Sequence, residues 1–245
     1  MNTIKDVKYY GICEDAKGND LKGQSIIAIG DIHGLNYWQK VVKENPNSKY
    51  VFLGDYLDPN ADMSHDLLID NLQQIVQFKQ EQPKNVVLLL GNHDLQYFLR
   101  GIDRCSRYDM FIAGKARPLF VENQSLFQYA HQEGNTIFTH AGIAHHWFVR
   151  DFKGDLTKNI ADQLNNPTPI QETALYRCGE CRGGEKDAVG GIFWADTEEL
   201  DEPLQGYTQV VGHNKVNNVT VHIKNGGRIV FCDCLFNKRC LRYIL

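Results

Sequence analysis

The chain has 245 residues, of which 42% are apolar, and its formal net charge is −4. We expect a single α/β domain over residues 1–245, because this length and composition support one sizeable core. The acidic balance and the absence of long Lys and Arg runs argue against binding to polymeric nucleic acid, which needs clustered cations.

The start of the chain and its cysteines indicate a cellular compartment. Met1–Asp20 is polar and charged, without the apolar core of a signal peptide. The longest apolar stretch, Val86–Leu90, is too short to span a bilayer, so we expect no membrane association. Seven cysteines, an odd number without a signal peptide, are typical of free thiols. A cytoplasmic protein is therefore expected.

Short apolar runs alternate with helical patterns along the chain. The runs that predict strands are Ser25–Ile29, Tyr50–Leu53, Val86–Leu90, Thr136–Thr139 and Gln209–Val211. Their continuous apolarity indicates strands that are covered on both faces. Helical spacing is found in Leu35–Glu44, His65–Phe78 and His93–Leu99. Strands alternating with helices predict an α/β fold.

The end of the chain has a different pattern. Val219–Lys224 and Arg228–Cys232 flank Asn225-Gly226-Gly227, which predicts a β-hairpin. Lys238–Ile244 is a candidate for a further strand. These antiparallel elements predict mixed sheets. Gly179–Gly191, rich in glycine and charge, is interpreted as a surface loop.

Each of the five apolar strands leads into a polar cluster. The clusters are Gly30-Asp31-Ile32-His33-Gly34, Gly54-Asp55-Tyr56-Leu57-Asp58, Gly91-Asn92-His93-Asp94, Thr139-His140-Ala141-Gly142 and Gly212-His213-Asn214. Ligands of α/β sheets collect beyond the carboxyl ends of the strands, where glycines let the backbone turn sharply. Alone, each cluster has an ordinary explanation, such as a helix cap or a buried histidine. Five of them in this order favour one shared site.

The ligand types indicate which ion the site would take. Carboxylates, imidazoles and an amide oxygen suit Mn, Fe or Zn better than an ion that prefers thiolates. The set is too large for one catalytic ion with open positions, and it fits two metals bridged by a carboxylate. We therefore expect two divalent metal ions, with Mn favoured and Fe or Zn as alternatives.

Together the five clusters resemble the signature blocks of the calcineurin-like metallophosphoesterases. The first two blocks are most similar to the branch that holds the serine/threonine protein phosphatases and related bacterial and phage phosphatases. The resemblance implies a four-layer sandwich, in which two mixed β-sheets pack together and are flanked by helices. It also implies a hydrolase that acts on a phosphorylated substrate.

The resemblance further implies a role for each matching residue. Asp31 and His33 would bind the first metal, and Asp55 would bridge both ions. The second metal would be bound by Asn92, His140 and His213. A hydroxide held between the metals would attack phosphorus in line. His93 would be the general acid for the leaving oxygen, and Asp58 would orient it.

Two positions depart from the protein phosphatase pattern. Pro59 stands where those enzymes carry an arginine, and Asp94 stands where they usually carry glutamate. A basic residue from elsewhere is then needed to hold the phosphate. We expect Arg177 or Arg182 to reach over the metals from the Gly-rich loop, although both could equally be solvated charges. The Cys178–Cys181 pair in that loop could bind zinc, but it lacks a matching second pair.

These observations predict a phosphomonoesterase for a phosphoprotein or a small phosphoester. The alternative within the family is a phosphodiesterase or a dinucleoside polyphosphate hydrolase. A nuclease is disfavoured by the acidic charge balance. A non-catalytic scaffold is disfavoured by the intact ligand set.

Overall fold

The computed structural model describes residues 8–13, 25–102 and 105–244. The strands are β1 (Lys8–Cys13), β2 (Ser25–Ile29), β3 (Lys49–Phe52), β4 (Val86–Leu89), β5 (Phe127–Gln128), β6 (Ala130–Glu133), β7 (Thr136–Thr139), β8 (Thr208–Lys215), β9 (Thr220–Lys224), β10 (Gly227–Asp233) and β11 (Arg239–Ile244). The α-helices are α1 (Tyr37–Glu44), α2 (His65–Glu81), α3 (Asn92–Phe98), α4 (Met110–Glu122), α5 (Ile160–Asn165) and α6 (Pro169–Leu175).

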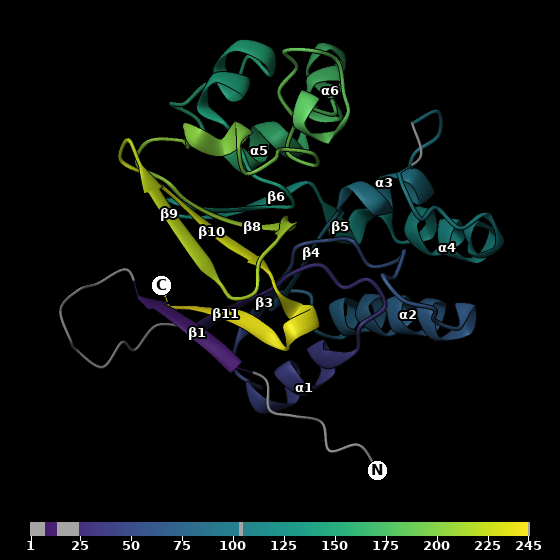
Figure 1. Ribbon diagram of the computed structural model, residues 1–245. Coiled ribbons are helices and arrows are strands. Elements are labelled where there is room, and N and C mark those ends of the chain that lie inside the picture. The colour runs from purple at the N-terminus through teal and green to yellow at the C-terminus, as the bar shows by residue number, and fades with distance from the viewer. Residues whose placement is uncertain (1–7, 14–24, 103–104, 245) are drawn as a thin grey trace.

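The strands form two mixed sheets (Figure 1). One has the order β1-β11-β2-β3-β4-β5, and the other has the order β6-β7-β8-β10-β9. The central strands β2, β3 and β4 run parallel to one another, as do β7, β8 and β10. The hairpin of β9 and β10 is antiparallel, as the sequence predicted, and the predicted last strand is β11, which pairs antiparallel with β2 and parallel with β1.

Side-chain alternation divides the core into two parts. In β2, Ile26 and Ala28 join a cluster of buried residues from both sheets, whereas Ile27 and Ile29 join the cluster on the helix side. β3 alternates in the same way, with Val51 facing the other sheet. Because both faces are covered, these strands are apolar throughout, as expected from their sequence.

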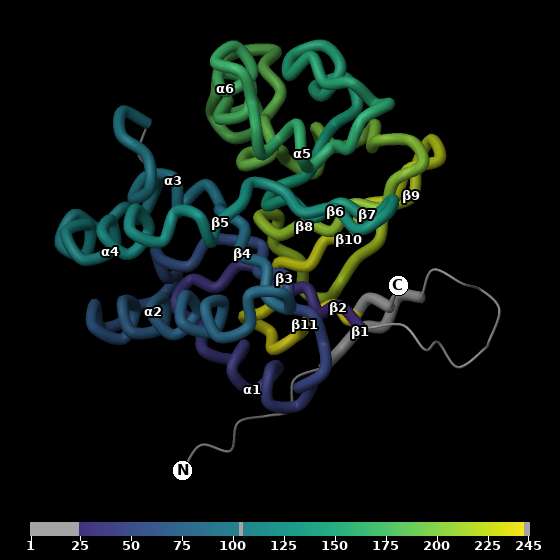
Figure 2. The backbone as a smooth tube through the Cα atoms, turned by 180° about the vertical axis from the view of Figure 1, so that it is seen from behind, coloured from purple at the N-terminus to yellow at the C-terminus, as the bar shows by residue number. Residues whose placement is uncertain are grey.

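Helices cover the outer faces of the two sheets. Figures 1 and 2 show α1 and α2 beyond the six-stranded sheet and α5 and α6 beyond the five-stranded sheet. This is the predicted four-layer arrangement of two mixed sheets flanked by helices. The three predicted helices are confirmed as α1, α2 and α3, and α4, α5 and α6 were not predicted. Among the described residues, every helix is too short or too polar to cross a membrane.

Candidate metal centre

A cavity of about 870 Å³ opens where strands of both sheets end. Asp31, Asp55 and Asn92 follow β2, β3 and β4, respectively. His140 follows β7, and His213 lies within β8. Since neighbouring strands run parallel, their carboxyl ends meet at one edge and bring these side chains together. The predicted ligands line the cavity, except for His140, which is fully buried beside it.

The first cluster consists of Asp31, His33 and Asp55, whose ligand atoms lie within 4.8 Å of one another. His33 Nε2 is 3.9 Å from Asp31 Oδ2 and 3.7 Å from Asp55 Oδ2. His33 Nδ1 donates a hydrogen bond to the carbonyl oxygen of Leu57 over 2.7 Å. Because a carbonyl only accepts, the proton is on Nδ1, and the lone pair on Nε2 is free to bind a metal.

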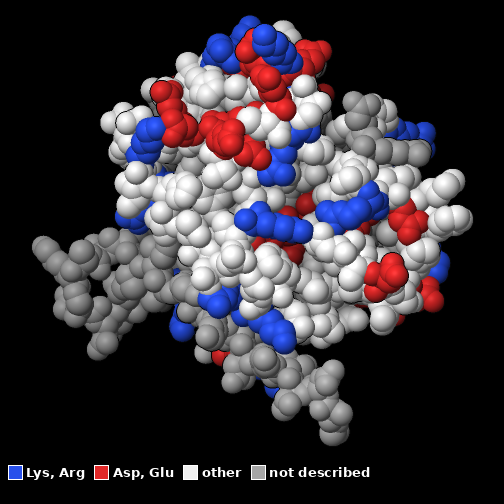
Figure 3. All heavy atoms as spheres, in the orientation of Figure 1, with Lys and Arg blue, Asp and Glu red and all other residues white. Residues whose placement is uncertain are grey.

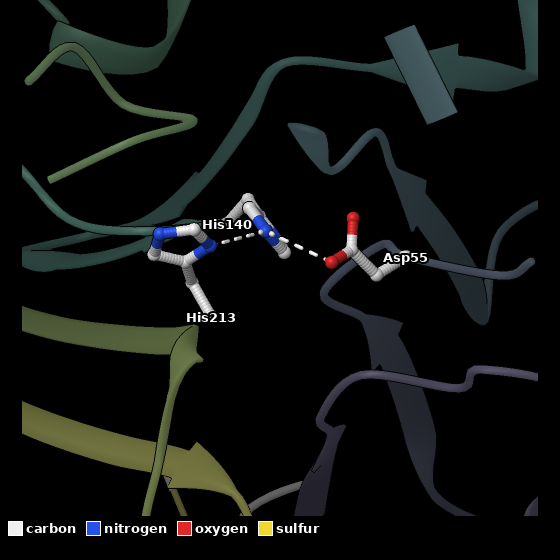
Figure 4. Close-up of side chains that lie close together, drawn as sticks. All are labelled: Asp55, His140 and His213. Carbon is white, nitrogen blue, oxygen red and sulfur yellow. Dashed lines mark hydrogen bonds and ion pairs between the residues drawn. The ribbon is translucent and has the colours of Figure 1, made fainter. Parts of the chain in front are cut away.

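The second cluster consists of Asp55, His140 and His213 (Figure 4). His140 Nε2 lies 3.6 Å from Asp55 Oδ2 and 3.2 Å from His213 Nδ1. The amide oxygen of Asn92 lies 2.9 Å from His140 Nε2. His140 Nδ1 donates to the Leu53 carbonyl oxygen over 2.8 Å, so Nε2 carries a lone pair. The lone pairs of His140 Nε2 and of the Asn92 amide oxygen therefore face each other. Two such acceptors repel unless both bind one cation, so these donors fit a metal ion.

Asp55 belongs to both clusters through one atom. Its Oδ2 lies between His33 Nε2 and His140 Nε2, at 3.7 Å and 3.6 Å. Its Oδ1 accepts the backbone N–H of His93 over 2.9 Å, which fixes the orientation of the carboxylate. A carboxylate oxygen between two imidazole nitrogens is expected where two metal ions share a ligand. The bridging role of Asp55 stays a prediction, and this geometry supports it.

Burial sets the protonation states of the ligands. It lowers the pKa of His140 and His213, and it lowers the pKa of His33 to about 4. The three imidazoles are therefore neutral near pH 7, which is the form that binds metal ions. Burial, followed by the neighbouring carboxylates, raises the pKa of Asp31. A divalent cation beside these carboxylates would offset that effect and keep them ionised.

Close backbone packing holds the ligand turns in place. A Cβ atom on Gly91 would lie 2.1 Å from Asp55 Oδ1, and one on Gly212 would lie 2.3 Å from Asp31 Oδ1. Any larger residue at either glycine would displace a ligand. Asp94 is fully buried and accepts the backbone N–H groups of Asp55 and Gly91 over 2.7 and 2.8 Å. The sequence marked Asp94 only as a departure, whereas the structure makes it an anchor for Asp55.

His93 and Asp58 form a pair beside the first cluster. His93 Nδ1 lies 2.8 Å from Asp58 Oδ2, and its ring is edge-on to that of His33 with centroids 5.3 Å apart. Asp58 is buried, and its carboxylate also accepts hydrogen bonds from Gln96 Nε2 and the Tyr97 hydroxyl. A carboxylate held in this way orients the imidazole that it contacts. The pairing expected from the sequence is thus in place at the cavity wall.

Arg107 lines the cavity and was missed by sequence reasoning. Its Nη1 donates to the Asp58 carbonyl oxygen over 2.7 Å and to Asn60 Oδ1 over 2.8 Å. Its Nη2 lies 3.2 Å from His93 Nε2. Arg107 therefore places a guanidinium group beside the Asp58-Pro59-Asn60 turn, where Pro59 replaces the arginine of the protein phosphatases.

Left-handed backbone conformations gather at the same cavity. They occur in four non-glycine residues that line it, His33, Asp55, Arg107 and His213, and in Asp58, which contacts His93 beside it, with φ between 41° and 67°. Each such conformation costs about 1–3 kcal/mol and persists where the surrounding structure imposes it, commonly at functional sites. Arg107 shares this property with four of the predicted site residues, which supports its inclusion in the site.

The two arginines of the predicted loop lie in different places. Arg182 lines the cavity; its Nε pairs with Asp196 Oδ2 over 2.7 Å, and its Nη2 donates to Asn214 Oδ1. Arg177 lines a neighbouring recess, where its Nη1 lies 3.9 Å from Asp151 Oδ1. Of the two candidates for phosphate binding, the geometry favours Arg182.

Asp233 also lines the cavity without having been predicted. It ends β10 and is buried, and its Oδ2 has no hydrogen-bond partner among the described residues. Burial, and then the charge of Asp55, raise the pKa of Asp233 to about 7. The same signal that marked the other ligands, an acid at the end of a buried strand, could have found it.

The cysteine pair gives no support to a zinc site. Cys178 lines the cavity, and its Sγ lies 3.3 Å from the Arg182 carbonyl oxygen. Cys181 is exposed, with its Sγ 3.9 Å from Glu198 Oε2. In the part of the chain that the structure describes, no cysteine belongs to a group of three or more close metal ligands.

The sequence matches a known family, and the fold is similar to solved structures. A family model described as calcineurin-like phosphoesterase matches residues 25–242. The cold-active protein-tyrosine phosphatase of the psychrophile Shewanella sp. is similar, with a TM-score of 0.53 and 16% identity over 95% of this chain and 75% of that one. A protein serine/threonine phosphatase from Saccharomyces cerevisiae gives a TM-score of 0.49 and 17% identity over 93% and 71%. Among curated proteins, none matches the sequence.

Proposed function

The chain belongs to the calcineurin-like phosphoesterases, and from this membership and its site we propose that it is a phosphomonoesterase that uses two divalent metal ions. The position of Asp55 Oδ2 between His33 Nε2 and His140 Nε2 carries the proposal. Two clusters that share this carboxylate provide for two ions, and their oxygen and nitrogen donors favour Mn²⁺. The substrate is a phosphoprotein or a small phosphoester.

The side chains around the clusters then have distinct tasks. Bound there, the divalent ions would activate water for attack on phosphorus and offset the charge of the phosphate. His93, oriented by Asp58, protonates the leaving oxygen from Nε2. Arg182 lines the cavity and donates to Asn214, the neighbour of His213, so we expect it to contact the phosphate on the side of the second cluster.

The cations of the cavity wall favour monoesters over diesters. A monoester dianion presents one more charged oxygen than a diester, and the Arg182 guanidinium in that wall supplies donors for it. We expect the Mn²⁺-loaded protein to hydrolyse p-nitrophenyl phosphate with a higher kcat/KM than bis-p-nitrophenyl phosphate or diadenosine tetraphosphate. Preference for either of the latter would favour the diesterase or polyphosphate hydrolase alternative. Undiminished hydrolysis after exhaustive chelation would contradict the metal-dependent mechanism.

Arg182→Ala should lower kcat/KM for p-nitrophenyl phosphate by about 10- to 100-fold, the loss expected for one charged hydrogen bond. Metal content should not change, because Arg182 belongs to neither ligand cluster. Arg177→Ala is the matched control, since it removes the same group from the same loop but outside the cavity. Wild-type kinetics in Arg182→Ala, or equal losses in the two variants, would remove Arg182 from phosphate binding.

A further inference from the structure

Two cations meet on one amide oxygen at the rim of the cavity. Asn60 Oδ1 accepts hydrogen bonds from Arg107 Nη1 over 2.8 Å and from Lys215 Nζ over 2.9 Å. The two charged nitrogens are therefore within two hydrogen-bond lengths of each other. Like charges at this separation repel, and one neutral amide offsets only a small part of that repulsion. Such a pair is stabilised when an anion binds beside it.

The nearby acidic residues leave both cations available. Within the described residues, neither Arg107 nor Lys215 has a carboxylate at ion-pair distance. Asp233 is Lys215's neighbour in the sheet, but it is buried beside the metal ligands while both cations are exposed. Figure 3 shows Lys and Arg side chains bordering a hollow that has acidic side chains in its floor.

The position of the pair identifies the part of the substrate that it faces. Arg107 Nη2 lies 3.2 Å from His93 Nε2, the nitrogen that protonates the leaving oxygen. The Arg107 guanidinium therefore lies on the leaving side of the scissile bond, where it can donate to an anionic group on that part of the substrate.

We propose that Arg107 and Lys215 form a subsite for a second phosphate group on the leaving part of the substrate. The inference rests on the proposed phosphatase function and narrows it to compounds with two phosphates a few bonds apart. The second phosphate binds between the two cations and accepts hydrogen bonds from both. The first phosphate lies at the metal ligands.

The test compares the monophosphate and the bisphosphate of propane-1,3-diol, which differ only in the second phosphate. A statistical factor of two is expected if the second phosphate is ignored, since either end can react. We expect kcat/KM to favour the bisphosphate by at least about 10-fold in the wild-type protein, the contribution of one charged hydrogen bond. Lys215→Ala should reduce this ratio towards two.

Two further variants sharpen the result. Asn60→Asp places a carboxylate between the cations and should also reduce the ratio, because it competes with the second phosphate. Lys224→Ala is the matched control. Lys224 lies on the edge strand β9, outside the cavity, and pairs with Asp201. Its loss should leave the ratio at the wild-type value. A ratio that falls equally in Lys224→Ala would contradict a local subsite.

Failure of the subsite and failure of the proposed function give different results. A wild-type ratio near two, with clear hydrolysis of the monophosphate, would overturn the subsite and leave the phosphatase proposal intact. Hydrolysis of neither compound would count against the proposed function. Calorimetry with propane-1,3-bisphosphonate and propylphosphonate tests the subsite without turnover. Tighter binding of the bisphosphonate, lost in Lys215→Ala, is expected, and equal Kd values would overturn the inference.

Discussion

His93→Asn is expected to lower kcat for an alkyl phosphate by about 10²- to 10⁴-fold, the usual contribution of general acid catalysis. The imidazole contacts the Asp58 carboxylate and lies outside both metal clusters, so the variant should keep its metal ions. Its backbone N–H, which orients Asp55, is unchanged by the substitution. The measurement is steady-state turnover at saturating Mn²⁺, with metal content determined on the same sample.

The leaving group provides the internal control for His93. p-Nitrophenolate needs no proton to depart, so the loss should be much smaller for p-nitrophenyl phosphate than for the alkyl phosphate. His65→Asn makes the same chemical change in an exposed histidine that pairs with Asp109, and it should behave like the wild-type protein. Equal losses for the two substrates in His93→Asn would exclude the acid role.

Asp55→Asn is expected to have the largest effect of any single ligand change, because one carboxylate oxygen serves both clusters. The amide keeps the shape of the side chain but loses its charge. Removing a residue that only hydrogen-bonds to a metal ligand lowers metal affinity by about 10- to 100-fold. Removing the shared ligand itself should therefore lower it by more than about 100-fold. Turnover at moderate Mn²⁺ should accordingly fall to background.

Asp31→Asn is the comparison variant for Asp55. Asp31 belongs to the first cluster alone, so its substitution should weaken one ion and leave the second cluster intact. Measured over a range of Mn²⁺ concentrations, its turnover should recover at lower metal concentration than that of Asp55→Asn. Identical metal dependence in the two variants would argue against a shared ligand.

The predicted metal ligands were accessible from sequence because each lies next to a recognisable strand. Asp31 and Asp55 stand two and three residues beyond the ends of β2 and β3, at positions that the strand itself fixes. Parallel strands then bring separate clusters to one edge without any knowledge of the loops between them. The terminal hairpin could be predicted from its Asn225-Gly226-Gly227 turn, whereas the packing of two sheets was implied only by the family resemblance.

Arg107 could not be found in this way. Its contact with Asp58 joins residues 49 positions apart, and it comes from a segment that is neither strand nor helix. The path of that segment is fixed by tertiary contacts: the backbone N–H of Cys105 donates to Gln96 and that of Asp109 donates to Tyr97. No local pattern in the sequence encodes these contacts.

The unpredicted helices show a second limit of pattern reasoning. α5 and α6 contain six and seven residues, too few for an apolar repeat to become visible. The start of α6 does carry a local signal, since Thr168 and Gln171 form a capping box around Pro169. In the loop after α6, Arg177 and Arg182 have the same side chain. The sequence therefore could not show that Arg182 lines the cavity and Arg177 a neighbouring recess.

Counting the metal ions bound to Asp55→Asn shows whether one carboxylate holds two ions. Wild-type protein and variant are loaded with Mn²⁺, dialysed together and analysed for metal per chain. Two ions are expected in the wild-type protein, and fewer than one in Asp55→Asn. Two tightly bound ions per chain in the variant would contradict the shared ligand and the two-metal mechanism that depends on it.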